Sequence, residues 1–378
     1  MVKKFLFIFC ICVLLSLTGC WDSKETNELA IVAGIAVDQS TSQKYNVTSQ
    51  IINIPNISSQ DGSESSRKPY VNISSEGQTV HDALHNDINT QSRSLYYPHS
   101  QILLISEDIV KDSIYPVIEG FVRNPEVRTI LWPFITKGEA KQLLAFDSKT
   151  EDIPAMYIGH LASRSQDALC DAYIQTLHNS LHVLQSDTSS LVLGMLKYDK
   201  TADCIQYDGS AVFKHNKMIG TLNKEETNGI IWCTKKISTG SLLAKCSESE
   251  EYFTVHIESS QNKITVSMKD EQITADIKVH AKGNIHEFPC SVDLLKEESL
   301  HKIEDMISKK IQQQILSAVK KSKEYNADIF QLGDRLIRKY PHRKDELVSS
   351  WDQLYPKIEI NINVSVEIPE VGLFFNFE

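Results

Sequence analysis

Residues 358–368 read IEININVSVEI, and apolar and polar side chains alternate through the whole stretch. Successive side chains of a β-strand point to opposite faces of its sheet. The stretch therefore predicts a strand with one buried face and one solvated face. The face predicted to be buried carries only β-branched side chains, which favour strands: Ile358, Ile360, Ile362, Val364, Val366 and Ile368.

The segments before this strand predict the layer to which it belongs. Three consecutive strands with short connections are predicted at 253–257, 264–268 and 273–279, because apolar and polar residues alternate in each. Such an arrangement is an antiparallel β-meander. A long helix is predicted over 297–323, where an aliphatic residue recurs every four positions: Ile303, Ile307, Ile311, Ile315 and Val319.

Two shorter helices are predicted at 328–339 and 345–354, followed by Pro341 and Pro356, which cannot continue a helix. The predicted order of elements is therefore three strands, three helices and the final strand. Helices that follow a meander in this way cover one face of its sheet. We expect residues 249–378 to form a C-terminal α+β domain.

Strands and helices alternate in the N-terminal half of the chain. Strands are predicted at 29–37, 45–53, 71–75, 101–105 and 128–135, and helices at 77–92, 107–121, 137–146 and 154–185. This alternation predicts an α/β domain over 20–187.

Residues 188–248 predict a small β-rich middle domain. Its strands are expected at 191–196, 210–214, 218–221 and 230–234, joined by turn residues such as Asn228-Gly229. The predicted fold class is thus α+β (mixed α/β). It comprises three domains, each a β-sheet with helices, at 20–187, 188–248 and 249–378.

The chain is acidic. Its 378 residues include 39 lysines and arginines and 49 aspartates and glutamates, which gives a net charge of −10 at neutral pH. It has no basic stripe, so we expect no nucleic acid among its partners.

The N-terminus predicts a lipid anchor. Lys3 and Lys4 precede an apolar run at 5–17, which as a helix would be about 20 Å long and too short to cross a bilayer. The run ends in Leu17-Thr18-Gly19-Cys20, the lipobox of bacterial lipoproteins. We expect residues 1–19 to be removed as a signal peptide. Acyl chains on Cys20 would then hold the mature protein on the extracytoplasmic face of the membrane.

Five cysteines follow Cys20: Cys170, Cys204, Cys233, Cys246 and Cys290. No two have C-x-x-C spacing, which excludes a zinc ribbon or a thioredoxin-like motif. Cys233 and Cys246 are candidates for a disulfide between neighbouring strands. The favoured alternative is that all five are single buried thiols that pack as small apolar groups.

His81 and His85 are candidates for metal chemistry, since two histidines four residues apart on a helix occur in zinc proteases. The residue after His81 is Asp82, however, where a protease uses glutamate as a base, and no third ligand is evident. The chain also lacks a nucleophile elbow, a phosphate loop and a dinucleotide-binding motif. We therefore expect no enzyme, no cofactor and no metal.

Several motifs resemble those of one family. Gly19-Cys20-Trp21-Asp22, followed by LAIVAGIAVD at 29–38, resembles the start of the Ger(x)C family, the C subunits of spore germinant receptors in Bacillus and Clostridium. FVRNPEVR at 121–128 is similar to the family's R-x-P-E-x-R segment. The likeness runs through the mature chain to Trp351 and Pro356.

The resemblance implies a three-domain α/β lipoprotein on the outer face of the spore's inner membrane. Such a protein works with a multispanning A subunit and a transporter-like B subunit, and the family has no known catalytic activity. Within the family's segment, Arg123, Pro125 and Arg128 could form a partner surface. The alternative is a structural turn in which Arg123 pairs with Glu126.

Two other classes of function remain open on the sequence. A solute-binding lipoprotein of an importer would share the anchor and the size, but it would have two similar doubly wound lobes, which the meander at 253–279 argues against. A zinc hydrolase would depend on His81 and His85.

Overall fold

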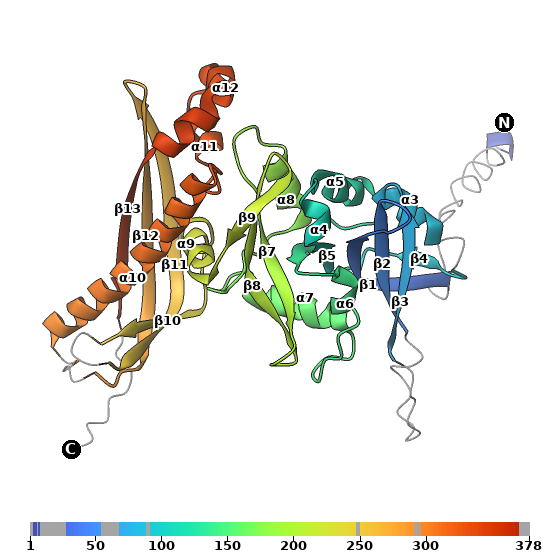
Figure 1. The fold of residues 1–378 in the computed structure, drawn as a ribbon, viewed down its shortest axis with the longest axis horizontal. Helices are drawn as coiled ribbons and strands as arrows, with labels where there is room; N and C mark the ends of the chain where they lie inside the picture. Colours follow the sequence, from blue (N-terminus) through green and yellow to red (C-terminus); the bar gives the residue numbers. More distant parts are fainter. Residues whose placement is uncertain are drawn as a thin grey trace.

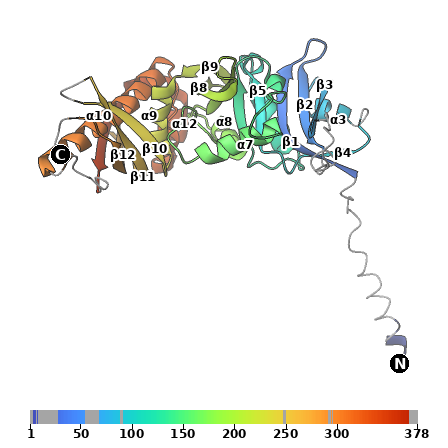
Figure 2. The same ribbon diagram turned by 90° about the horizontal axis from the view of Figure 1, so that it is seen from below.

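The computed structural model describes residues 3–5, 7, 28–53, 68–87, 91–246, 250–290, 294 and 296–369. These residues form two β-sheets with helices, and the two lobes lie end to end in an elongated molecule (Figure 1, Figure 2). The predicted mixed α/β fold class is confirmed. Cys20 and most of the predicted signal peptide lie outside the described residues.

The N-terminal lobe is built on a nine-stranded sheet with the order β3-β2-β1-β5-β6-β7-β8-β9, and β4 pairs with the start of β1. The central pairs β1–β5, β5–β6 and β6–β7 are parallel. The pairs on either side of them, β3–β2, β2–β1, β7–β8 and β8–β9, are antiparallel. The strands are β1 (Leu29–Gln39), β2 (Tyr45–Ile52), β3 (Tyr70–Gly77), β4 (Ser94–Tyr96), β5 (Ile102–Ser106), β6 (Trp132–Thr136), β7 (Val192–Asp199), β8 (Cys204–Lys214) and β9 (Lys217–Leu222).

Helices cover both faces of this sheet, because its central strands are apolar on both sides. In β5, Leu103 and Ile105 pack into one layer, while Ile102 and Leu104 pack into the other. Such continuously buried strands are typical of parallel sheets. The first layer contains α3 (Val80–Asn86), α4 (Glu107–Val110), α5 (Tyr115–Arg123) and α8 (Leu177–Leu184), and the second contains α6 (Ala140–Leu143) and α7 (Pro154–Ser165).

Several predicted helices are shorter or divided. The helix predicted at 107–121 is α4 and α5, and the one predicted at 154–185 is α7 and α8. Between α7 and α8 the backbone bonds to distant segments: the Leu169 N–H donates to the Thr239 carbonyl at 2.9 Å, and the Gly194 N–H donates to the Tyr173 carbonyl at 2.8 Å. Backbone groups paired at long range cannot also form a helix.

Within the described residues, the segment 188–248 has no sheet of its own. β7, β8 and β9 extend the first sheet, and β10 belongs to the second. The strand predicted at 230–234 is wrong, because these residues end the helix α9 (Lys224–Thr234). A capping box starts this helix: the Asn223 side chain accepts the Glu226 N–H at 3.0 Å, and the Glu226 carboxylate accepts the Asn223 N–H at 2.8 Å. A short apolar run that is buried on all sides has no periodicity to separate helix from strand.

The C-terminal lobe is built on a four-stranded sheet with the order β10-β11-β12-β13. Its strands are β10 (Gly240–Lys245), β11 (Tyr252–Lys269), β12 (Gln272–Glu287) and β13 (Glu359–Glu367). The first two predicted strands of the meander form one continuous strand, β11, because β12 pairs with it along its length. The register of this pairing is irregular between Ile257 and Ser259. The predicted final strand is confirmed as β13, which runs parallel to β12.

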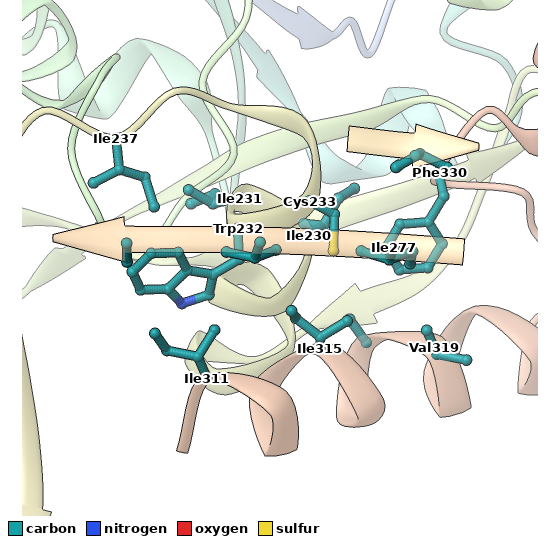
Figure 3. Close-up of a cluster of buried hydrophobic side chains, with 14 of the residues drawn as sticks. Ile230, Ile231, Trp232, Cys233, Ile237, Ile277, Ile311, Ile315, Val319 and Phe330 are labelled. Atoms are coloured by element: carbon teal, nitrogen blue, oxygen red, sulfur yellow. The ribbon is translucent and has the colours of Figure 1, made fainter. Parts of the chain in front are cut away.

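Helix α10 (Glu297–Glu324) covers one face of this sheet together with α9. The predicted isoleucine stripe is buried, with Ile307, Ile311 and Ile315 fully inaccessible to solvent. Figure 3 shows Ile311 and Ile315 directed from α10 toward the core that contains Trp232 of α9. The indole N–H of Trp232 donates to the side-chain oxygen of Gln314 at 2.9 Å, so the polar groups buried between the two helices satisfy each other.

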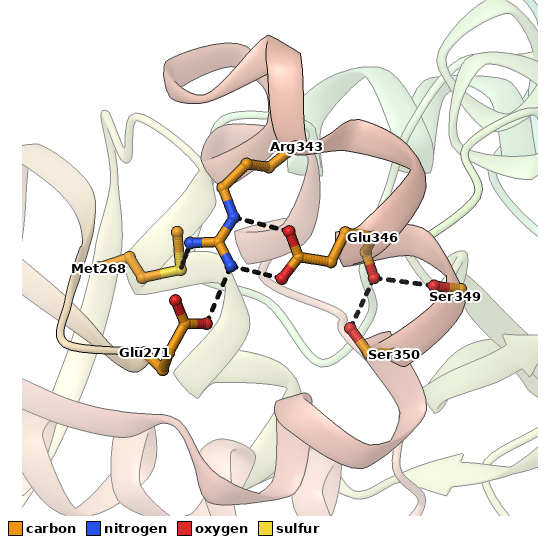
Figure 4. Close-up of polar contacts among 6 residues, drawn as sticks. All are labelled: Met268, Glu271, Arg343, Glu346, Ser349 and Ser350. Atoms are coloured by element: carbon orange, nitrogen blue, oxygen red, sulfur yellow. Dashed lines mark hydrogen bonds and ion pairs between the residues drawn. The ribbon is translucent and has the colours of Figure 1, made fainter.

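Two short helices, α11 (Leu332–Lys339) and α12 (Lys344–Leu354), follow α10, and 3₁₀ turns at Pro341–Arg343 and Tyr355–Lys357 flank α12. Arg343 ties this region to the β11–β12 hairpin (Figure 4). Its guanidinium donates to Glu346 in α12 and to Glu271 at the tip of the hairpin, the latter at 2.9 Å. The predicted helix at 328–339 begins later, at Leu332.

The two lobes also meet where residues 186–190 contact the segment after α10. The Ser190 N–H donates to the Asp328 carbonyl at 3.0 Å, and the Asp334 carboxylate accepts the hydroxyls of Ser186 and Ser189 at 2.8 and 2.6 Å. The buried carboxyl of Asp328 accepts two N–H groups at the start of α11, and burial raises its pKa to about 7.

Cys246 forms a disulfide with Cys290, so the candidate bond between Cys233 and Cys246 does not form. Cys233 is buried in α9 as a single thiol, since the strand on which that pairing depended is a helix. The Cα atoms of Cys246 and Cys290 lie 5.7 Å apart, within the usual range for a disulfide. The expectation of single thiols therefore fails for these two residues.

We expect Ile311→Ala to lower the free energy of unfolding by about 2–5 kcal/mol, because the change leaves a cavity beneath α10. Gln313→Ala is the control, since Gln313 is exposed on the same helix, and it should change this energy by less than about 0.5 kcal/mol. Urea unfolding measures both values. Equal midpoints for the two variants would contradict the packing of α10.

We expect three of the five cysteines after Cys20 to react with a thiol reagent in denaturant before reduction. The double variant Cys246→Ser/Cys290→Ser should be less stable by about 2–4 kcal/mol, because the bond closes a loop of 44 residues. Cys204→Ser, which removes a free thiol, is the control. Five reactive thiols before reduction would disprove the bond.

Candidate partner surface

Residues 124–131 connect α5 to β6 as a loop whose backbone is held at both ends. The Asn124 side chain accepts a backbone N–H from two residues further on at 3.0 Å, and the Asn124 carbonyl accepts the Val127 N–H at 3.1 Å. N–H groups at the start of α8 donate to the carbonyls of Thr129 and Leu131 at 2.9 and 2.8 Å. Val127 and Leu131 are buried. The loop therefore has a fixed shape, and the strand predicted at 128–135 begins only at Trp132.

Four side chains at the end of α5 and on this loop face solvent, and we call them the partner surface: Arg123, Pro125, Arg128 and Ile130. Ile130 is 64% exposed, and arginine with exposed apolar area is typical of protein interfaces. Arg123 pairs with Glu119 one helical turn earlier, so the expected pair with Glu126 is wrong. Among the described residues, Arg128 has no ion-pair partner.

Two hollows adjoin the partner surface. One of about 340 Å³ is lined by His81, His85, Arg93 and the loop residues 124–126. The other, of about 480 Å³, lies between α3 and α5, and His81 and Asn124 line both. The rings of His81 and His85 stack with their centroids 6.4 Å apart. The fold thus brings the histidines of α3 beside the arginine-proline segment, a proximity that the sequence does not reveal.

Two polar residues that sequence reasoning missed line the first hollow. Asp87 is 1% exposed and Tyr97 is 4% exposed. Burial raises the pKa of Asp87 to about 6. Burial likewise raises the pKa of Tyr97 above its usual value. Neither residue belongs to a recognisable motif, and only the tertiary packing of this part of the lobe buries them.

The histidine pair supplies two imidazoles on an exposed face of α3. The part of the chain that the structure describes brings no group of three histidine, cysteine, aspartate or glutamate residues close enough to hold a metal. Asp82, in the place of a protease's base, accepts the Gln78 N–H at 2.8 Å, while Thr79 caps α3 by accepting the Asp82 N–H. Asp82 therefore has a structural role at the start of α3.

The chain enters the N-terminal lobe beside this surface. Leu29 pairs with Ser94 in β4, and Arg93 and Ser94 line the first hollow. Cys20 is nine positions before Leu29 and lies outside the described residues. Among the helices of the described part, none has both the length and the apolar composition that a bilayer span requires.

Two family models match the chain in succession. The model described as "Spore germination protein N-terminal domain" matches residues 22–198, and "Spore germination B3/ GerAC like, C-terminal" matches residues 208–372. Both lobes are thus of the type found in spore germination proteins. The chain belongs to the Ger(x)C family, and the resemblance seen in its motifs is confirmed.

Full-length relatives agree with this assignment. Spore germination protein KC of Bacillus subtilis (strain 168) is 25% identical, over 99% of this chain and 97% of its own length. Spore germination protein A3 of the same organism is 26% identical over 96% of each chain. The crystal structure of the GerBC protein has a TM-score of 0.56 at 19% identity, over 89% of this chain and 97% of that one. This last likeness shows the fold.

We expect the double variant His81→Ala/His85→Ala to change the free energy of unfolding by less than about 0.5 kcal/mol, because both side chains are exposed. Val80→Ala, in the buried stripe of α3, is the control and should cost roughly 1–3 kcal/mol. Thermal unfolding separates the two variants. Tight zinc binding that only the histidine variant loses, seen by calorimetry, would restore the metal-site interpretation.

Proposed function

We propose that this protein is the non-catalytic, lipid-anchored C subunit of a spore germinant receptor. The match of both lobes to the Ger(x)C family carries the proposal, and the lipobox ending at Cys20 supports the anchor. The membrane-embedded A and B subunits would be its partners. The C-terminal lobe has helices on one face of its sheet, so it does not support the alternative of a solute-binding protein with two doubly wound lobes.

The proposed anchor would fix the orientation of the molecule. Leu29 is nine positions after Cys20, and an extended chain of that length spans at most about 30 Å. The end of the N-terminal lobe that carries β4 would therefore stay near the bilayer. Figure 1 shows the C-terminal lobe at the opposite end of the molecule.

The partner surface is the region we propose for contact with the membrane subunits. It shares the first hollow with the point where the chain enters the fold, so the tether would hold it near the membrane. Arg128 and Ile130 offer a charge and an apolar side chain on a loop with a fixed backbone. A preorganised loop loses little conformational entropy on binding.

We expect Cys20→Ala to release the protein from spore membranes, because the lipobox cysteine is the acceptor of the proposed acyl chains. Fractionation followed by a salt wash measures retention. Cys204→Ala is the control and should stay with the membrane. Retention of the Cys20 variant after the wash would contradict the anchor.

We expect Arg123→Glu/Arg128→Glu to reduce co-purification with the A and B subunits from detergent-solubilised spore membranes, because reversed charges repel the complementary groups of a partner. Lys200→Glu/Lys217→Glu, on exposed positions of the β7–β9 region, is the charge-matched control. Both variants keep Cys20, so membrane retention should be unchanged. Equal recovery of the membrane subunits with both variants would contradict this partner surface.

A further inference from the structure

A cleft of about 320 Å³ lies where the two lobes meet. One wall belongs to the first lobe and comes from residues within 183–191 and from 213–216 at the end of β8. The other wall belongs to the second lobe and includes Asn326, which follows α10, and Trp351 and Asp352 of α12. Small-molecule sites occupy about 300–1,000 Å³. The cleft therefore has room for one small ligand, which would touch both lobes.

The lysine and the two aspartates that line the cleft are held in ion pairs. Lys214 Nζ in the first lobe lies 2.7 Å from a carboxylate oxygen of Asp352 in the second. A carboxylate oxygen of Asp187 lies 3.4 Å from Nζ of Lys344, at the start of α12. His215, in the turn after β8, is the other titratable side chain of the lining. With both pairs formed, the cleft presents no uncompensated ammonium or carboxylate, so it favours a neutral ligand over an ion.

Two polar groups that line the cleft are buried without a hydrogen-bond partner. Trp351 is 4% exposed, and no described residue accepts its indole N–H. The side-chain oxygen of Asn326 is buried as well, and no described residue donates to it. The amide of the same side chain donates to the Asp352 carbonyl at 3.0 Å, which fixes its orientation. Buried polar groups are nearly always paired, so the cleft calls for an acceptor at Trp351 and a donor at Asn326.

Close packing between the lobes holds the indole of Trp351 in place. Residue 333 is glycine, and a Cβ atom there would lie 2.5 Å from Cβ of Thr188 and 2.9 Å from the indole ring. Glycine thus allows both side chains to approach the same point. The Thr188 hydroxyl in turn donates to Asp334 at 3.3 Å. The indole N–H is therefore a preorganised donor, which lowers the entropic cost of binding a ligand.

Hydroxyl groups match this arrangement. A hydroxyl oxygen can donate one hydrogen bond and also accept others, whereas a carboxylate only accepts and an ammonium only donates. A molecule with neighbouring hydroxyls could therefore satisfy both Trp351 and Asn326. The cleft is also lined by the hydroxyl-bearing residues Ser186, Ser189 and Ser190, and an uncharged ligand would leave the ion pairs of the lining intact.

We propose that the cleft between the lobes binds a small neutral polyol. Its hydroxyl groups would accept the N–H of Trp351 and donate to the side-chain oxygen of Asn326. The ligand would contact both lobes and hold them in the relative position that the structure shows. This site shares no residue with the partner surface, so it does not depend on the proposed contact with the membrane subunits.

NMR signals of the indole N–H groups test this site in the full chain, kept in a detergent without a sugar headgroup. The chain has four tryptophans, and the variant Trp351→Phe assigns the signal of residue 351. We expect myo-inositol, a neutral ring polyol, to shift the Trp351 signal in a saturable manner. The Trp232 signal is the internal control and should not move, because its N–H donates to Gln314.

A variant of the second wall tests the contact with Asn326. Asn326→Gly should weaken the binding of myo-inositol about 3–10-fold, because it removes a hydrogen-bond acceptor. Glycine suits the left-handed backbone at this position, where φ is 48°. Asp270→Gly is the matched control, since residue 270 also has a φ of 48° and lies in the β11–β12 turn. It should bind myo-inositol as the unmodified chain does.

The other outcomes overturn the proposal. If myo-inositol moves no indole signal, ordered water alone occupies the cleft. Equal binding by the Asn326→Gly variant and the unmodified chain would place the polyol elsewhere. Quinate, a ring polyol that carries a carboxylate, should bind more weakly than myo-inositol, and tighter binding of quinate would contradict a neutral ligand.

Discussion

The contact between α9 and α10 is the interaction on which the remaining structure depends. α9 directly follows β9 of the first sheet, whereas α10 covers the second sheet. Their contact therefore joins the end of the first lobe to the core of the second. The helices approach closely because residue 229 is glycine: a Cβ atom there would lie 2.2 Å from the carbonyl oxygen of Gln314. The Gln314 side chain also satisfies the indole N–H of Trp232. The helix that follows the first sheet is therefore packed tightly into the core of the second lobe.

The two lobes joined by α9 and α10 form an elongated molecule whose two ends have different properties. At one end, the chain enters through β1 and β4 beside Arg93 and the partner surface. At the other end, β13 closes the second sheet and leaves an edge next to α10. In a tethered protein the first end would face the membrane and its embedded partners, while the second would extend away from it (Figure 2).

The candidate surface shows how far local sequence can define a site. Arg123, Pro125 and Arg128 lie within eight consecutive residues of one motif, so the sequence alone could point to them. Asp87 and Tyr97 could not be found in this way, because each is polar, lies outside any motif and becomes buried only in the folded lobe. The partner of Arg123 also depends on the structure: Glu119 and Glu126 are both close in sequence, and Arg123 pairs with Glu119 because both lie on α5, one helical turn apart.

The sequence by itself determined the elements that have a clear period, namely the alternating strand β13, the isoleucine stripe of α10 and the alternation of strands and helices in the first lobe. These patterns reflect burial on one face, which each segment encodes locally. Only the tertiary structure decided that 230–234 is a helix, that β7 to β9 extend the first sheet and that Cys246 bonds to Cys290. The physical reason is that an apolar run buried on all sides carries no period, while strand pairing and disulfides join groups that are distant in the chain.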